Sequence, residues 1–224
     1  MEANQPIRVL VVDDDQKICD AYRSMFARSP EVELVGEIHD GLHAAATYKR
    51  VNPDIVLMDI QMPVVSGIDA TREIVSQWPE AVVVATTVFG NRELVVAMLR
   101  AGASGYLLKD VSLEQLVGFL KQALSGEMPL SSGVRRELVA SVVDEGATAS
   151  THDLAPREVE LVQWLAHGLS NAQIAKRMYI SEGSVKKYIA RIGAKLGTVS
   201  RTQVLVRSIQ LGIVDPRSLP PITG

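Results

Sequence analysis

The first 125 residues alternate five times between a short apolar run and a segment whose apolar residues recur at helical spacing. Short, almost wholly apolar runs are typical of parallel strands that are buried on both faces. The five runs are Arg8–Val12, Val32–Ile38, Asp54–Met58, Ala81–Thr86 and Gly105–Leu108. Alternation of this kind predicts an α/β fold: a doubly wound, flavodoxin-like sheet of five parallel strands.

Polar residues with chemical capability follow four of these runs. In a doubly wound sheet, ligands bind beyond the carboxyl ends of the strands, so we expect these side chains to meet at one edge. They are Asp13, Asp14 and Asp15 after the first run, Asp59 after the third, Thr86 and Thr87 after the fourth, and Lys109 after the fifth. An alternative is that the carboxylates cap the helices that follow them, which suits any single one better than the whole set.

Clustered carboxylates raise one another's pKa values unless a cation neutralises them. A set of oxygen ligands suits a hard divalent ion, and Mg²⁺ binds through one or two carboxylates while keeping sites for phosphate oxygens. An aspartate can attack phosphorus to form an aspartyl phosphate, with a lysine and the metal neutralising the transferring group. The sequence therefore predicts phosphoryl chemistry at this edge.

The last third of the chain has helical periodicity throughout. We expect four short helices there, at Pro156–His167, Asn171–Met178, Glu182–Leu196 and Thr202–Leu211, and a further helix at Val134–Val143. Residues 144–151 are small, polar and aperiodic, which is typical of a linker. The predicted organisation is an α/β domain over residues 1–125, a helix and linker over 126–151, and a small all-α domain over 152–224.

Charge divides the chain in the same way. Residues 1–125 carry 11 basic and 17 acidic residues, whereas residues 126–224 carry 12 basic and 9 acidic residues. Between residues 170 and 210 there are eight basic residues and one acid, Glu182. A basic patch of this kind favours contact with a polyanion such as DNA. A low aromatic content of 4% argues against binding of single strands by base stacking.

The basic segment has the pattern of a helix-turn-helix. Ser170 and Gln173 form a predicted capping box, and Ser181 is a suitable N-cap for the helix that follows. Lys186 and Lys187 lie off the apolar stripe of that helix, where they could enter the major groove of DNA. A solvated, charged face on an ordinary helical bundle is the alternative.

The strand-end motifs resemble the receiver domain of bacterial response regulators over roughly residues 6–125. The motifs are Val11–Asp14, Asp59–Pro63, Thr86–Thr87 and Gly105–Asp110, in this order along the chain. Asp15 is a third acid at a position that is variable in that family.

This resemblance implies specific roles. Asp59 is the expected phospho-acceptor, and Asp13 and Asp14 are expected to hold Mg²⁺ together with the Asp59 carboxylate and the backbone carbonyl of Gln61. Thr86 is expected to donate its hydroxyl to the phosphoryl group.

Two further residues complete the set implied by the receiver family. Lys109 is expected to pair with the phosphoryl group, and Tyr106 to change its rotamer on activation.

The C-terminal motifs resemble the LuxR-type helix-turn-helix over about residues 152–215, and the two parts together resemble the NarL/FixJ class of response regulators. The motifs are Leu154–Glu158, Gly168–Ala175, Ile180–Lys186 and Lys195–Gly197. The DNA-contacting residues implied are Ser184, Lys186, Lys187, Ala190, Arg191, Arg201 and Thr202. Ala155 replaces the usual N-cap threonine, Tyr188 replaces histidine, and Gly193 lies within a helix.

The implied function is that of a DNA-binding transcriptional response regulator. A sensor histidine kinase would phosphorylate Asp59 in the presence of Mg²⁺, and the phosphorylated chain would bind a double-stranded operator as a homodimer. The chain would be a phospho-acceptor that catalyses its own phosphoryl transfer and not an enzyme with turnover. A single cysteine, a polar start and no long apolar run favour the cytoplasm and no membrane partner.

Two other functions fit parts of the sequence. Asp13 and Asp15 offer the Asp-x-Asp motif of haloacid-dehalogenase-like phosphatases, but Lys17 stands where that family has threonine or valine, and the basic segment has no role there. The other alternative is a DNA-binding regulator that responds to a small ligand without phosphorylation. The complete set of Asp59, Thr86 and Lys109 argues against it.

Overall fold

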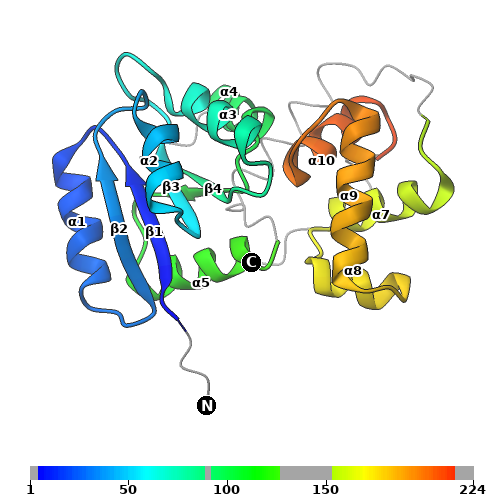
Figure 1. Ribbon diagram of the computed structural model, residues 1–224, viewed down its shortest axis with the longest axis horizontal. Helices are drawn as coiled ribbons and strands as arrows, with labels where there is room; N and C mark the ends of the chain where they lie inside the picture. Colours follow the sequence, from blue (N-terminus) through cyan, green and yellow to red (C-terminus); the bar gives the residue numbers. More distant parts are fainter. Residues whose placement is uncertain (1–4, 89–91, 127–152, 215–224) are drawn as a thin grey trace.

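The predicted fold class is confirmed by the computed structural model, which describes residues 5–88, 92–126 and 153–214 (Figure 1). Five parallel strands form one sheet in the order β2-β1-β3-β4-β5. This order places β1 and β3, which lead into the aspartates, side by side at the centre. The strands are β1 (Ile7–Val12), β2 (Val32–Ile38), β3 (Ile55–Asp59), β4 (Val83–Thr87) and β5 (Gly105–Leu108).

Helices cover both faces of the sheet. One face packs against α1 and α5 through a core that includes Tyr22, Leu116 and Leu120, and the other packs against α2, α3 and α4. The helices are α1 (Gln16–Phe26), α2 (Ala44–Val51), α3 (Gly67–Gln77), α4 (Arg92–Ala101) and α5 (Leu113–Leu124). Because both faces are buried, the central strands are apolar throughout, which is why they are visible in the sequence.

The second domain contains four described helices, at Pro156–Ala166 (α7), Asn171–Met178 (α8), Glu182–Leu196 (α9) and Arg201–Gln210 (α10). Each agrees with the predicted helix to within one residue at either end. The predicted helix at Val134–Val143 and the linker over 144–151 lie outside the described residues. No helix in the described part of the chain is long and apolar enough to span a membrane.

The two domains pack against each other through α4 and α10. The side-chain amide of Gln203 donates a hydrogen bond of 2.9 Å to the backbone carbonyl of Arg100 at the end of α4. Next to it, Gly102 has φ of +108° and comes so close to α10 that a Cβ atom there would lie 3.3 Å from Ser200 Oγ. The buried apolar core of the α3/α4 face continues into the helical domain.

Candidate functional site

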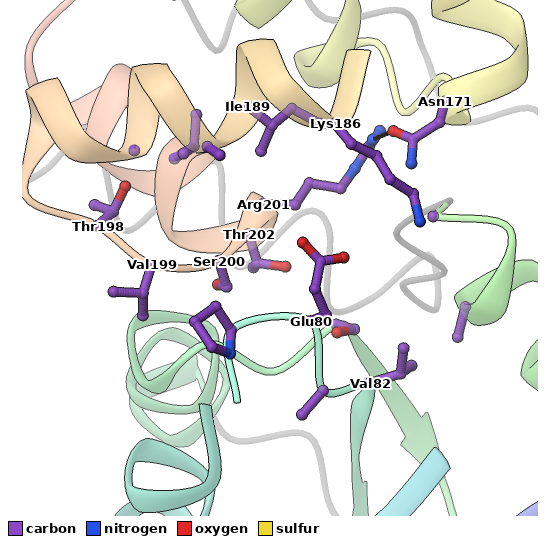
Figure 2. Close-up of a pocket in the computed structure, with 18 of the residues that line it drawn as sticks. Glu80, Val82, Asn171, Lys186, Ile189, Thr198, Val199, Ser200, Arg201 and Thr202 are labelled. Atoms are coloured by element: carbon purple, nitrogen blue, oxygen red, sulfur yellow. Dashed lines mark hydrogen bonds between the residues drawn. The ribbon is translucent and has the colours of Figure 1, made fainter. Parts of the chain in front are cut away.

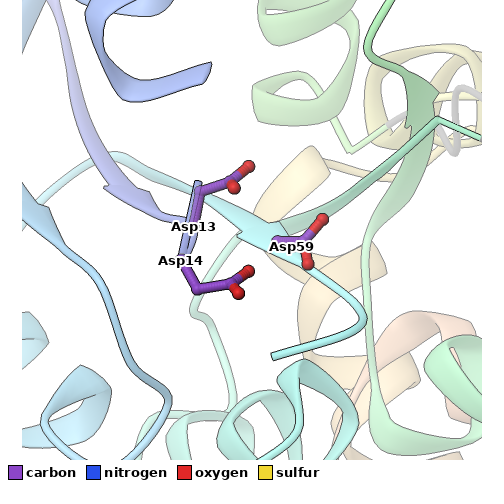
Figure 3. A group of neighbouring side chains, drawn as sticks. All are labelled: Asp13, Asp14 and Asp59. Carbon is purple, nitrogen blue, oxygen red and sulfur yellow. The ribbon is translucent and has the colours of Figure 1, made fainter. Parts of the chain in front are cut away.

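Three carboxylates converge where β1 and β3 end. Asp13 and Asp14 follow β1, Asp59 is the last residue of β3, and one oxygen atom of each lies within 4.8 Å of the others (Figure 3). Asp13 and Asp59 are buried, whereas Asp14 is exposed. The sequence prediction that these three residues meet at one edge of the sheet therefore agrees with the structure.

Asp15 has a different role from its two neighbours. Its carboxylate accepts a hydrogen bond of 2.9 Å from the backbone N–H of Lys17 and so caps the N-terminus of α1. The capping alternative considered for the acidic cluster thus applies to Asp15, which leaves Asp13 and Asp14 for the site.

Lys109 lies between two of the carboxylates. Its Nζ atom is 2.6 Å from Asp13 Oδ2 and 2.6 Å from Asp59 Oδ1. Burial works against the charge of the ammonium group, but the hydrogen bonds to Asp13 and Asp59 outweigh it and hold the pKa of Lys109 above its ordinary value. The lysine is therefore a fixed positive charge in direct contact with the predicted phospho-acceptor.

The position of Asp59 depends on its backbone surroundings. The backbone N–H of Gln61 donates to Asp59 Oδ2 at 3.0 Å, which orients the carboxylate. The chain then turns so tightly into α3 that a Cβ atom on Gly67 would lie 1.8 Å from the Asp59 carbonyl oxygen. Burial raises the pKa of Asp59, and Lys109 counteracts part of this effect. A metal contact by the Gln61 carbonyl remains a prediction.

The donor set suits a divalent cation of the Mg²⁺ type. Carboxylate oxygens are hard ligands, and three of them within reach of one another carry more negative charge than Lys109 alone neutralises. The exposed Asp14 leaves an approach from solvent, through which a phosphorylated donor could also enter.

The two threonines at the end of β4 lie on opposite faces of the sheet. Burial raises the pKa of Tyr106, and the Thr87 side chain acts in the opposite direction, which places Thr87 beside the tyrosine hydroxyl. Burial and the charge of Asp13 likewise raise the pKa of Tyr22 on α1, where the Thr86 side chain opposes them. Tyr106 therefore lies beside Thr87, whereas Thr86 lies on the side of Tyr22 and is paired with Asp59 in the register of β3 and β4.

In the helical domain, α8 and α9 form the predicted helix-turn-helix. Ser170 and Gln173 make the predicted capping box of α8, and Ser181 caps α9 by accepting from the Ser184 N–H at 3.1 Å. Tyr179 ends α8 in a left-handed conformation, with φ of +56°, which produces the tight turn. The apolar stripe of α9 faces the domain core, with Val185 and Ile192 fully buried.

Two departures from the usual LuxR pattern, one on α9 and one at the start of α7, have structural explanations. A Cβ atom on Gly193 would lie 2.7 Å from the Thr198 carbonyl oxygen, so the turn after α9 requires glycine there. At the start of α7, Ala155 cannot cap with its side chain, but the Glu158 carboxylate accepts from the Ala155 N–H at 2.8 Å and Pro156 has no N–H to satisfy. The loss of a cap expected from Ala155 is therefore partly compensated.

The residues predicted to contact DNA fall into two groups. Lys186, Lys187 and Ala190 are exposed on α9, and among the described residues no ion pair involves either lysine. Ser184 is half-buried, and its hydroxyl lies 2.9 Å from that of Ser181.

The second group is engaged within the domain. Arg191 Nε lies 2.7 Å from Glu158 Oε1, and its guanidinium covers the Tyr188 ring at 4.5 Å. Arg201 donates to Asn171 Oδ1 at 2.7 Å and to the Leu169 carbonyl, and Thr202 is buried. No sequence signal links these residues to partners about thirty positions away, so only the structure reveals this engagement.

The exposed face of α9 looks onto the receiver domain. Lys186 and Ala190 line a cavity whose opposite wall contains Pro79, Glu80 and Val82 from the segment that leads into β4 (Figure 2). Two of the three residues predicted to face base edges, Lys186 and Ala190, thus lie across a hollow from the α/β domain that is too small to admit a DNA duplex.

Comparison with known proteins identifies both domains. Residues 9–121 match the family model of the response regulator receiver domain, and residues 152–208 match that of bacterial regulatory proteins of the luxR family.

Full-length relatives have the same arrangement. The chain is 35% identical over 213 residues to the transcriptional regulatory protein YxjL of Bacillus subtilis, covering 93% of this chain and 98% of the relative. It is 31% identical to the nitrate/nitrite response regulator NarL of Escherichia coli K12, covering 92% and 96%. The crystal structure of ChrA, the response regulator of a heme-sensing two-component system, is 30% identical, with a TM-score of 0.52 over 94% of this chain and all of that chain. The chain therefore belongs to the NarL/LuxR family of two-component response regulators and is a DNA-binding transcriptional regulator.

Proposed function

We propose that a partner histidine kinase phosphorylates Asp59 in the presence of Mg²⁺, and that this modification controls dimerisation and operator binding. The observation that carries the proposal is the contact of Lys109 with both Asp13 and Asp59 at 2.6 Å. This contact holds the Asp59 carboxylate, the proposed nucleophile, beside the positive charge of Lys109. The exposed Asp14 shows that the site is accessible from solvent.

The transfer is a displacement at phosphorus. An oxygen atom of Asp59 attacks the phosphorus of a phosphohistidine, the P–N bond breaks, and its electron pair returns to the histidine of the kinase as the acyl phosphate forms. Lys109 moves from the Asp59 carboxylate to the new phosphoryl oxygens, which carry more negative charge. Asp13, Asp14 and Asp59 would hold Mg²⁺, which supplies further neutralisation of those oxygens when bound.

The signal leaves the site through the end of β4 in this proposal. Thr86 is paired with Asp59 in the register of β3 and β4, and its neighbour Thr87 lies beside Tyr106. Tyr106 is fully buried next to α4, which is the helix that contacts α10. A phosphoryl group on Asp59 would draw the Thr86 hydroxyl toward it, and the shift of Thr87 and Tyr106 would carry the change to the domain interface.

The arrangement of the two domains defines the unphosphorylated form. Because Lys186 and Ala190 face the receiver domain, the reading face of α9 cannot enter a major groove until the domains separate. Phosphorylation would favour separation, and the released helical domains would bind two half-sites as a symmetric dimer.

The proposal is tested with acetyl phosphate and Mg²⁺ as the phosphodonor system. Asp59→Asn should abolish the mass increase of one phosphoryl group, whereas the exposed Asp20→Asn on α1 should leave it unchanged, and a chelator should prevent it in the parent. The phosphorylated parent should have the molar mass of a dimer in solution and should bind duplex DNA more tightly than the unphosphorylated parent. Undiminished labelling of Asp59→Asn, or equal DNA affinity with and without the phosphoryl group, would overturn the proposal.

A further inference from the structure

The space between the domains has the size of a small-molecule site. Its volume is about 470 Å³, within the range of roughly 300–1,000 Å³ found for ligand pockets. Both domains contribute walls: the segment that leads into β4 and the end of α5 on one side, and α9, α10 and the turn between them on the other. Neither domain encloses the space alone, so the cavity exists only while the domains are together.

The apolar part of the lining comes from both sides. Val82 and Leu124 belong to the receiver domain, and Ile189, Val199 and Val204 belong to the helical domain. Leu124 and Val199 are among the large apolar side chains that remain substantially exposed in the described part of the chain. A ligand with an apolar body would cover them and remove that area from water.

The polar part of the lining favours an anion. Lys186 and Arg201 bring two positive charges to the cavity, and Glu80 brings one negative charge from the opposite wall (Figure 2). Lys186 has no ion-pair partner among the described residues, whereas Arg201 is held by Asn171 and the Leu169 carbonyl. The surplus is one positive charge, located mainly at Lys186.

Two further side chains that line the cavity can donate hydrogen bonds. Asn171 Oδ1 accepts from Arg201, which leaves the amide hydrogens of Asn171 to donate. Ser200 Oγ accepts from the Gln203 N–H at 3.2 Å, so its own hydroxyl hydrogen is still available. Donors next to a cation are the arrangement that binds carboxylates and sulfonates.

We propose that this interdomain cavity binds a small monoanion with an apolar body, such as an aromatic or branched carboxylate or sulfonate. The ligand would hold the domains together and oppose DNA binding, because Lys186 cannot contact the ligand and a DNA groove at the same time. The inference rests on the closed arrangement described under the proposed function, but it does not require that Asp59 accept a phosphoryl group.

The probe for this site is anilinonaphthalene sulfonate, which has an aromatic body, a single negative charge and a fluorescence that rises in apolar surroundings. The full-length chain should bind it saturably with one site per chain. The neutral N-phenylnaphthylamine, which has the same rings without the sulfonate, should bind more weakly.

Variants locate the binding site. Lys186→Met should raise the Kd of the sulfonate by about threefold, the effect of losing a partly exposed ion pair, and should leave the Kd of the neutral amine unchanged. The neighbouring Lys187 does not line the cavity, so Lys187→Met is the matched control and should bind both probes like the parent. Glu80→Gln removes the one carboxylate and should tighten sulfonate binding.

Mixed-sequence duplex DNA at low salt should displace the sulfonate from the parent. Equal effects of Lys186→Met and Lys187→Met, no change in Glu80→Gln, or simultaneous binding of sulfonate and DNA would each overturn the inference. Mass measurement of phosphoryl transfer to Asp59 separates the two proposals. A chain that accepts a phosphoryl group but fails these binding tests contradicts only the cavity ligand. A chain that passes the binding tests but accepts no phosphoryl group contradicts only the phosphorylation.

Discussion

Adjacent residues at the end of a strand contact different helices, and the two threonines that end β4 accordingly lie beside different tyrosines. The strand alternates between the two cores, with Val84 on the α1/α5 side and Ala85 on the α2/α3/α4 side. The sequence places a hydroxyl at the end of this strand but does not determine which of two consecutive threonines faces Tyr106. That choice depends on strand register and twist, which the run of apolar residues in Ala81–Ala85 does not reveal.

Thr87→Ala should therefore separate phosphorylation from its output. We expect the variant to accept a phosphoryl group from acetyl phosphate but to lose the gain in DNA affinity, because the hydroxyl beside Tyr106 is missing. Thr86→Ala, at the position paired with Asp59, should also lose the gain in DNA affinity, because the hydroxyl that donates to the phosphoryl group is missing. Mass spectrometry and DNA-binding titration of the two variants measure this, and a lost response in Thr86→Ala alone would exclude Thr87 from the route.

Glu158 has the most concentrated set of charged contacts in the helical domain. Its buried carboxylate accepts from Arg191 Nε at 2.7 Å, from Lys195 Nζ at 2.8 Å and from the Ala155 N–H. Burial by itself raises its pKa, but these three donors prevail and hold the pKa below its ordinary value. The charged form is thus favoured by folding, so its contribution to stability exists above the ordinary pKa and is lost as the pH falls through the lower value of the folded state.

Glu158→Gln should lower the free energy of unfolding by roughly 1–3 kcal/mol at neutral pH, because two cations lose their charged partner. The difference from the parent should shrink as the pH falls below the ordinary glutamate pKa of 4.5 and should be smallest below the lower pKa of the folded state, where Glu158 of the folded parent is protonated. Urea unfolding across this pH range measures the effect. Glu160→Gln, at an exposed position two residues later, is the control, and an equal loss there would contradict the interpretation.

At the scale of elements, the sequence predicted most of the structure. Strands and helices agree to within about two residues because buried parallel strands and capped helices have strong local patterns. The orientation of α9 in its domain is a different matter. Arg191 counts as one more positive charge in the sequence, yet in the structure it is bound to Glu158 on α7, a contact between residues 33 positions apart. Local patterns contain no information on such partners.

Gly183 and Gly193, both on α9, test the difference between local helix propensity and contacts with the rest of the domain. Alanine is the better helix former by up to about 1 kcal/mol, so Gly183→Ala, where a Cβ atom would meet nothing closer than 3.8 Å, should stabilise the domain. Gly193→Ala should destabilise it, because the new Cβ would lie 2.7 Å from the Thr198 carbonyl. Thermal unfolding of both variants provides the measurement. Stabilisation by both would show that the turn after α9 moves to accommodate a Cβ atom at position 193 and does not require glycine there.

Lys186→Ala and Lys187→Ala should each weaken operator binding, and at least one of them should relax sequence preference. A side chain that reads bases contributes roughly 1–3 kcal/mol of discrimination, so its alanine variant should lose sequence preference. A side chain that contacts phosphate should weaken all sequences alike and reduce the salt dependence of binding. Binding selections on random duplexes at two salt concentrations distinguish these outcomes. Parental affinity and preference in both variants would place the recognition surface elsewhere.

At the scale of the whole molecule, the contact between α4 and α10 was not predictable from sequence, because neither helix has an apolar pattern that distinguishes domain contacts from the internal core. The hydrogen bond from Gln203 to the Arg100 carbonyl is its clearest polar element. The same side chain accepts from the backbone N–H of Ser200 at 3.3 Å, which makes it part of the capping box of α10, and from the backbone N–H of Val199 at 2.9 Å.

Gln203→Glu should open the interface without unfolding α10. Glutamate preserves the capping acceptor but replaces the donor to the Arg100 carbonyl with a negative charge, so the unphosphorylated chain should bind DNA up to about tenfold more tightly. Gln115→Glu, the equivalent capping position of α5, leaves the interface untouched and should bind like the parent. DNA titration of both unphosphorylated variants is the measurement, and no gain in Gln203→Glu would exclude this contact as a restraint.

The buried core that runs without interruption from the α3/α4 face into the helical domain also has a consequence for how the protein melts. Two domains that share a core unfold in one cooperative step, since exposing the shared surface weakens both. Scanning calorimetry of the unphosphorylated chain should therefore show a single heat-absorption peak. If phosphorylation separates the domains as proposed, the peak should divide in two, with the smaller helical domain melting independently of the sheet.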